Sequence, residues 1–146
     1  MLHTQSLDLA AANKAIAAGI EAATKLGRPM AFAVVDAGAG LIAAARMDGA
    51  HARILKHSIR KAYTSATMCR NTLSFKADLE ERNGNLEQWG DSELTTLPGG
   101  MVIREGTAFV GAIGAGGGGP DDEAVAAIMV RAMGFQPVAD SRIAKK

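Results

Sequence analysis

The glycine-rich stretch GAIGAGGGGPDDEAVAA, residues 111–127, constrains the fold of this 146-residue chain more than any other segment. It contains a literal G-x-G-x-x-G at residues 114–119, the fingerprint of dinucleotide-binding folds. That fold also needs a parallel strand ending in an acidic residue about 20 positions later, and nothing strand-like precedes Asp140. The acidic residues 121–123 suit the positive end of a helix dipole and would repel a pyrophosphate. We therefore interpret the glycines as a loop that turns sharply or lies close to another chain segment or a flat ligand.

Two pairs of short apolar segments predict antiparallel hairpins. The first pair comprises residues 30–37 and 41–48, which are separated by a glycine-rich turn. The second pair comprises residues 101–104 and 107–115, which are joined by a Glu-Gly turn. Consecutive hairpins favour an antiparallel sheet over a parallel, doubly wound one.

Apolar side chains at helical spacing predict helices before, between and after the hairpins. The first helix is expected to be capped by Ser6, and the predicted spans are residues 7–26, 52–69, a short helix near 75–82, and 121–133. The side chains expected to face the core are Leu9, Ile16, Ile20 and Ala23 in the first helix, Leu55, Ile59, Ala62, Ala66 and Cys69 in the second, and Val125, Ile128, Met129 and Met133 in the last.

The predicted class is α+β, with an antiparallel sheet of about four to five strands and helices packed around it in a profilin-like layered sandwich. No repeat or linker divides the chain, so we expect a single domain. Its core is expected over residues 6–134, followed by a loose tail over residues 135–146.

The charge balance is even, with 16 Lys and Arg against 15 Asp and Glu, which gives no general attraction to nucleic acid or to a membrane surface. The single cysteine, Cys69, excludes an internal disulfide and fits a reducing compartment. The first residues lack the pattern of a signal peptide, and no apolar run is long enough to span a bilayer. We expect a cytoplasmic protein that contacts neither nucleic acid nor membrane.

Four motifs in a fixed order resemble the GlcG/HbpS-like family, also described as a haem-degrading or haem-binding domain family. The motifs are VVDAGAGLIAAARMDGA (34–50), KAYTSA (61–66), LPGGMVI (97–103) and FVGAIGAGGGGPDDEAVA (109–126). The resemblance implies an antiparallel sheet with packed helices and assembly from dimers up to octamers. It also implies haem binding, haem degradation or redox sensing in some members, and a place beside catabolic enzymes in others. The family often has G-V-S-G-G where this chain has glycine and alanine at 114–118, so the loop lacks a hydroxyl group here.

Three charged residues around the first hairpin are candidates for a site. Asp36 ends an apolar strand, and a buried carboxylate needs a partner, for which Arg46 is the candidate. The pair would either hold the hairpin together or clamp a substrate, because arginine recognises a carboxylate through two parallel hydrogen bonds. Asp48 is expected to form a turn or a helix cap, or to line the same site.

Lys61 and Glu123 are the next candidates. Lys61 lies beside the apolar stripe of its helix, where it would either be solvated or reach into a cleft to bind an anion or transfer a proton. Glu123 would either complement the helix dipole or act as an acid or base beside the glycine loop. The backbone expected to approach a ligand is Gly99, Gly100, Gly116 and Gly117.

Two histidines lie near or in the second predicted helix. His51 and His57 are either solvated or capping histidines or axial ligands of haem, and the basic side chains of helix 52–69 suit haem propionates. Their spacing of six residues does not match the i,i+4 pattern of a metal site, so no metal is expected. Cys69 is expected to be a small core residue.

Two functions remain open from the sequence. The first is binding of haem or a related tetrapyrrole near the glycine loop or in a subunit interface. The second is a cofactor-independent lyase, isomerase or hydratase that acts on an organic acid in a catabolic pathway. In that enzyme Arg46 or Lys61 would hold the carboxylate, and Asp36 or Glu123 would move the proton.

Overall fold

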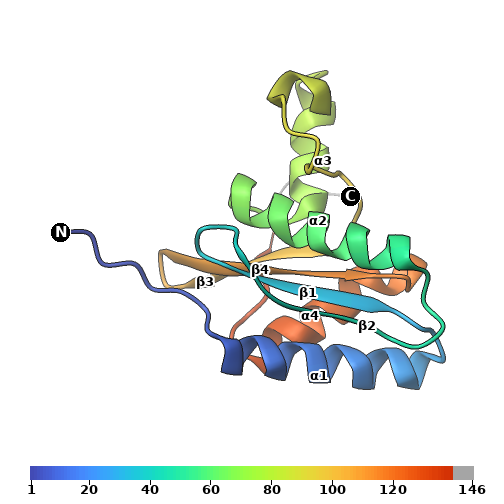
Figure 1. The fold of residues 1–146 in the computed structure, drawn as a ribbon. Helices are drawn as coiled ribbons and strands as arrows, with labels where there is room; N and C mark the ends of the chain where they lie inside the picture. The colour runs from blue at the N-terminus through green and yellow to red at the C-terminus, as the bar shows by residue number, and fades with distance from the viewer. Residues whose placement is uncertain (140–146) are drawn as a thin grey trace.

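The sheet has four strands, all antiparallel, in the computed structural model, which describes residues 1–139 (Figure 1). The strand order is β2-β1-β4-β3. The strands are β1 Ala31–Asp36, β2 Leu41–Arg46, β3 Gly100–Glu105 and β4 Ala108–Gly116. Both predicted hairpins form, and the α+β class with an antiparallel sheet is confirmed.

Helices cover both faces of the sheet, as Figure 1 shows. One face carries α2 (Ala52–Met68), and the opposite face carries α1 (Leu9–Leu26) and α4 (Asp122–Ala132). Helix α3 (Thr72–Glu81) follows α2 and stands away from the sheet. Two short 3₁₀ helices complete the described chain, η1 (Leu86–Trp89) and η2 (Gly119–Asp121). The element order matches the predicted one.

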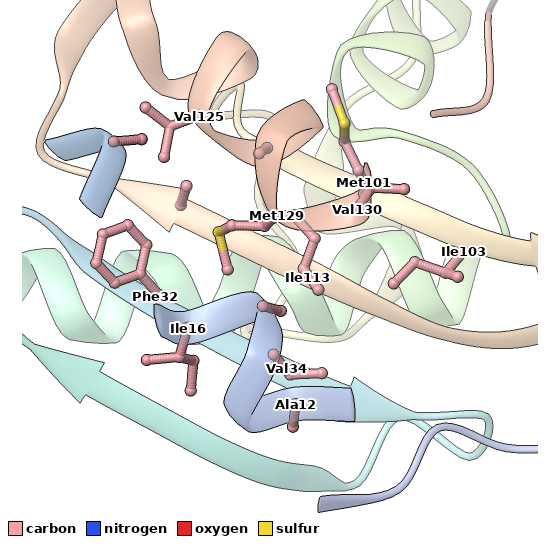
Figure 2. Packing of buried hydrophobic residues seen from close by; sticks show 14 of the residues in the cluster. Ala12, Ile16, Phe32, Val34, Met101, Ile103, Ile113, Val125, Met129 and Val130 are labelled. Atoms are coloured by element: carbon pink, nitrogen blue, oxygen red, sulfur yellow. The ribbon is translucent and has the colours of Figure 1, made fainter. Parts of the chain in front are cut away.

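The main core lies between the sheet and the α1–α4 layer (Figure 2). There Phe32 and Val34 of β1 pack with side chains of the two helices that include Ile16 and Met129. The other side chains of β1 face α2 in a second cluster of small residues, Ala33, Val35, Ala62, Ala66 and Ala112. Strand β1 is therefore buried on both faces, as its apolar sequence predicts.

Helix α1 begins later than predicted, and of its predicted core residues only Ile16 and Ala23 are buried. Its N-cap is Asp8, whose Oδ1 accepts a hydrogen bond from the Ala11 amide at 2.9 Å, whereas Ser6 Oγ accepts from the Ala37 amide at 3.0 Å. Leu9 and Ile20 are 56% and 37% exposed, so their prediction as core residues is wrong. The buried face consists of small residues around Ile16: Ala12, Ala15, Gly19, Ala22 and Ala23. This face lets the helix backbone approach the sheet closely, because a Cβ on Gly19 would lie 2.8 Å from the Phe32 ring.

Helix α2 rests on glycines of the sheet. A Cβ on Gly114 would overlap the Ser58 carbonyl, and one on Gly100 would lie 2.5 Å from the Lys61 carbonyl. Of the predicted stripe, Ala62 and Ala66 are buried, and the close approach also buries Ser58, Lys61, Thr64 and Ser65, which the stripe did not include. Cys69 is the exposed, left-handed C-cap, so its prediction as a core residue is wrong. Ile128 of α4 is also exposed, contrary to its predicted place in the core.

The register of the first hairpin separates Asp36 from Arg46. Arg46 pairs with Ala31 at one end of the hairpin, while Asp36 lies at the other end beside the turn. Asp36 Oδ1 accepts hydrogen bonds from the amides of Gly38 and Gly40 at 2.8 and 2.9 Å and so organises that turn. The predicted Asp36–Arg46 pair is therefore wrong, because a six-residue strand keeps its two ends apart.

The first residues after α4 pack against the rest of the domain. Phe135 packs against the main core, and Asn71 Nδ2 donates a hydrogen bond to the Val138 carbonyl at 2.9 Å. The remainder of the predicted loose tail, 140–146, lies outside the described residues. In the part of the chain that is described, no helix combines the length and apolar character needed to cross a membrane.

Candidate functional site

The glycine loop after β4 is held from two sides. Asp122, the first residue of α4, accepts a hydrogen bond at Oδ1 from the Gly118 amide at 2.7 Å. From the other side, Arg28 Nη1 donates to the Gly118 carbonyl at 2.8 Å. The acidic start of the helix therefore binds the loop itself.

Lys61 reaches the same loop from α2. Its Nζ donates to the Ala115 carbonyl at 2.8 Å and to Asp122 Oδ2 at 3.0 Å. The side chains of Lys61 and Asp122 are only 4% and 11% exposed, so the alternative of a solvated Lys61 is wrong. A charge buried to this degree needs a partner of opposite sign, and Asp122 provides it. The pair joins α2, the end of β4 and the start of α4.

Glu123 lies beside this pair and faces the loop before β3. Its Oε1 accepts a hydrogen bond from the Gly99 amide at 3.0 Å. Burial raises the pKa of the Glu123 carboxyl, while the Gly99 amide and the nearby Lys61 charge act in the opposite direction. Glu123 therefore binds a proton more readily than an exposed glutamate.

The structure brings several predicted glycines to this cluster. A Cβ on Gly99 or Gly116 would lie 3.3 Å from Lys61 Nζ, so both glycines leave room for the ammonium group. Gly100 instead donates its amide to Thr72 Oγ1 at 3.0 Å and belongs to the contact with α2 and α3. At Gly99, Gly100 and Gly116 other groups of the chain lie close to the backbone, and ligand binding at these glycines stays a prediction.

A cavity of about 370 Å³ opens between the start of α2 and Gly117 of the loop. Three basic side chains line it, those of Arg28, His51 and Arg53. Its other lining residues are apolar or glycine: Pro29, Gly49, Ala50, Ile54 and Gly117. The cavity therefore combines positive charge with a partly apolar wall.

Backbone geometry shapes this cavity. Gly117 has φ +94°, and a Cβ there would lie 3.0 Å from the Pro29 carbonyl and 3.1 Å from Ile54 Cγ2. His51 is the N-cap residue of α2, and its side chain makes no capping hydrogen bond. The imidazole therefore stands at an uncapped helix start, beside amide groups that favour negative charge.

The remaining predicted site residues lie around or away from this cavity. Arg46 Nη1 donates to the carbonyl of Ala50, a lining residue, at 3.4 Å, and Asp48 is exposed in the turn before Gly49. His57 lies further along α2 and is not among the lining residues, and Asp36 lies at the opposite end of β1. Within residues 1–139, no group of His, Cys, Asp and Glu could hold a metal ion.

Sequence reasoning missed Arg28 and Asp122. Arg28 follows the C-cap Gly27 and reads only as part of a helix stop, because its contact with Gly118 is 90 residues distant in the chain. Asp122 was interpreted only as a dipole-complementing residue. One sequence signal could have found Asp122. Lys61 lies among small and polar residues of its helix, and a lysine buried there requires an acidic partner.

Solved structures with this fold are known. Protein ORFY of Klebsiella pneumoniae matches with a TM-score of 0.83 and 24% identity, over 92% of this chain and 94% of that chain. A structure described as a PduOC–heme complex matches with a TM-score of 0.82 and 22% identity, over 92% of this chain and 99% of that chain. At these identities the two likenesses show the fold alone.

A further match has higher sequence identity. The Streptomyces reticuli HbpS double mutant matches with a TM-score of 0.79 and 30% identity, over 90% of this chain and 89% of that chain. A sequence search of curated proteins finds no match. The family model described as haem degrading protein HbpS-like matches residues 7–131, which is most of the chain. The chain therefore belongs to the HbpS-like haem-degrading protein family.

Proposed function

We propose that this protein binds haem or a related tetrapyrrole in the cavity at the start of α2. The observation that carries the proposal is the convergence of one imidazole and two guanidinium groups on a partly apolar cavity of about 370 Å³. Family membership and the heme complex of PduOC, which shares the fold, support the same ligand class. The volume lies within the range of about 300–1,000 Å³ that is typical of ligand pockets.

The lining residues fit the chemistry of haem. His51 would offer an axial nitrogen, and Arg28 and Arg53 would pair with the two propionates. Pro29 and Ile54 would pack against the ring, and Gly117 would let a flat group approach the backbone. Bound haem would supply one-electron and oxygen chemistry, on which degradation or redox sensing would depend. The protein's part is to bind, orient and neutralise the group.

A hemin titration tests this proposal. The Soret band of the wild type is expected to shift saturably with one hemin per chain, and His51→Ala is expected to alter the shifted spectrum. His57→Ala is the matched control, because His57 is on the same helix and outside the cavity lining. A spectrum that does not saturate, or that responds equally to both variants, would contradict the proposal.

A second candidate function rests on Glu123. A carboxyl whose pKa is raised by burial, beside a buried lysine, is the kind of group that transfers protons in enzymes acting on organic acids. A lyase, isomerase or hydratase of this kind would exchange substrate hydrogens with solvent. NMR in D₂O with a set of 2-hydroxy and 2-oxo acids would detect such exchange, and Glu123→Gln would abolish it. Exchange without any hemin binding would favour the enzyme over the haem protein.

We also propose that the protein is a cytoplasmic homo-oligomer, from a dimer up to an octamer. The cavity is open to solvent, so a second copy would cover the exposed edge of a bound ring. Light scattering on the purified protein gives the subunit number. A protein that is monomeric both with and without hemin would contradict the proposed homo-oligomer.

A further inference from the structure

A second hollow lies at the other end of α2, where α3 stands away from the sheet (Figure 1). Its volume is about 360 Å³. It is lined by Met68, Arg70, Phe75, Asp78, Arg82 and Trp89. None of these residues lines the cavity at the start of α2, so the two spaces are separate.

The hollow carries an excess positive charge. Arg82 Nη2 lies 2.7 Å from Asp78 Oδ2, and Arg70 Nη1 lies 3.8 Å from Asp78 Oδ1. One carboxylate thus faces two guanidinium groups, which leaves one positive charge among these three side chains. Arg70 Nη1 is also buried without a hydrogen bond, so the ionic contact with Asp78 satisfies it incompletely.

An aromatic surface adjoins this charge. Trp89 is 45% exposed, although its ring packs edge-on against the buried Phe75 with centroids 6.0 Å apart. The short helix η1 that ends at Trp89 begins with a capping box between Asn85 and Gln88, which fixes its position. The exposed indole is therefore held in place by local structure.

Arg82 and Trp89 also line a neighbouring hollow of about 490 Å³, whose lining residues run from the end of α3 to η1. These two side chains are the residues common to both spaces. Arg82 has one guanidinium nitrogen on Asp78, and its remaining N–H groups are available to a ligand in either hollow.

We propose that this hollow binds a small aromatic monocarboxylate. The carboxylate would accept hydrogen bonds from Arg82, with Arg70 contributing charge, and the ring would pack against the exposed indole of Trp89. A single negative charge matches the single excess positive charge, whereas a dianion such as phosphate would exceed it and be repelled by Asp78 more strongly than a monocarboxylate is. The proposal is independent of haem binding, because it uses none of the residues of the other cavity.

Trp89 makes this proposal directly testable, since it is the only tryptophan of the chain. Benzoate is titrated while Trp89 emission is recorded, with excitation on the red edge of the indole band, where benzoate does not absorb. A saturable change is expected with benzoate. Benzamide, which has the ring without the charge, and acetate, which has the charge without the ring, are each expected to bind about tenfold more weakly or worse.

Two variants separate the site from a general effect. Arg82→Gln is expected to weaken benzoate binding about tenfold or more. Arg60→Gln is the matched control, because Arg60 forms an exposed ion pair with Glu93 and does not line the hollow. Circular dichroism checks that both variants are folded, and Arg82→Lys keeps the charge if Arg82→Gln does not fold.

Three results would overturn the proposal. The first is no saturable response to benzoate, and the second is an equal response to benzamide. The third is Trp89 emission that changes with protein concentration and no longer responds to benzoate, which would show that a second copy covers the hollow.

Discussion

Lys61 Nζ and Asp122 Oδ2 lie 3.0 Å apart beneath the glycine loop, and both side chains are almost completely buried. The second oxygen of Asp122 holds the Gly118 amide, so one carboxylate joins a helix to the loop that borders the cavity. The loop conformation therefore depends on a buried charge pair.

Replacing only one residue of this pair should lower the free energy of unfolding more than replacing both. Lys61→Met leaves the Asp122 carboxylate buried and uncompensated, and we expect a loss of about 3–5 kcal/mol in the free energy of unfolding, measured in urea. Lys61→Met with Asp122→Asn should recover a large part of that loss, because asparagine keeps an oxygen for the Gly118 amide.

An exposed pair provides the control for this measurement. Lys25 and Glu21 lie 3.2 Å apart on the surface of α1, and Lys25→Met should change stability by no more than about 0.5 kcal/mol. A single Lys61→Met variant as stable as Lys25→Met would contradict the structural role of the buried pair.

Gly114→Ala should disrupt the contact between α2 and the sheet. The new methyl group would overlap the Ser58 carbonyl and lie 2.9 Å from the Ala62 amide, and neither backbone group moves easily. We expect a loss of about 2 kcal/mol or more, measured by thermal or urea unfolding. Gly38→Ala is the matched control, since its methyl group would meet only Asp36 Oδ1 at 3.5 Å. Equal effects of the two substitutions would show that α2 can shift.

Glu123→Gln should change how stability depends on pH. Because the folded pKa of Glu123 is raised, the folded protein binds more protons than the unfolded chain just above the ordinary glutamate value of 4.5. Wild-type stability contributed by this group is therefore greatest below that pH and is lost as the pH rises through the folded pKa. Glutamine can still accept from the Gly99 amide, so the variant should lack this loss. Parallel stability curves from the ordinary glutamate value of 4.5 up to neutral pH would contradict the assignment.

Tyr63→Phe should reduce a contribution to stability that, unlike that of Glu123, is lost as the pH falls. Tyr63 Oη donates to Asp91 Oδ2 at 2.6 Å, and this hydrogen bond lowers the pKa of the Asp91 carboxyl. Stability from the bond is present above the ordinary aspartate pKa and is lost as the pH falls through the lowered value. The variant should thus be less stable than the wild type at neutral pH, with the difference shrinking in acid. A constant difference across an acid titration followed by circular dichroism would argue against this bond.

Local sequence signals were sufficient for the order of elements and the antiparallel sheet. Each hairpin has two short apolar segments around a glycine-containing turn, and this pattern can be recognised without knowing what the rest of the chain does. Gly27 ends α1 in the predicted place, with φ +68°, for the same local reason.

The side-chain partners depended on contacts that local patterns do not contain. Gly100 and Gly114 admit the backbone at Ser58 and Lys61, so the buried face of α2 includes small and polar residues besides Ala62 and Ala66 of the predicted stripe. The expected Asp36–Arg46 pair ignored the register of the hairpin. The position of Lys61 at the edge of an apolar stripe is compatible with a side chain in solvent or in a cleft. The ion pair with Asp122, which is distant in the sequence, decides between these alternatives.

The two proposed sites lie at opposite ends of α2, and the middle of this helix packs on Gly100 and Gly114. His51 precedes its first residue and Arg70 follows its C-cap, and 17 helical residues at about 1.5 Å each put roughly 25 Å between them. Because the middle of this helix packs closely against Gly100 and Gly114, we expect it to resist sliding or rolling on the sheet when a ligand binds at either end. Groups so far apart without shared partners contribute additively. Saturating hemin should therefore leave the benzoate dissociation constant unchanged, and each ligand would be sensed on its own.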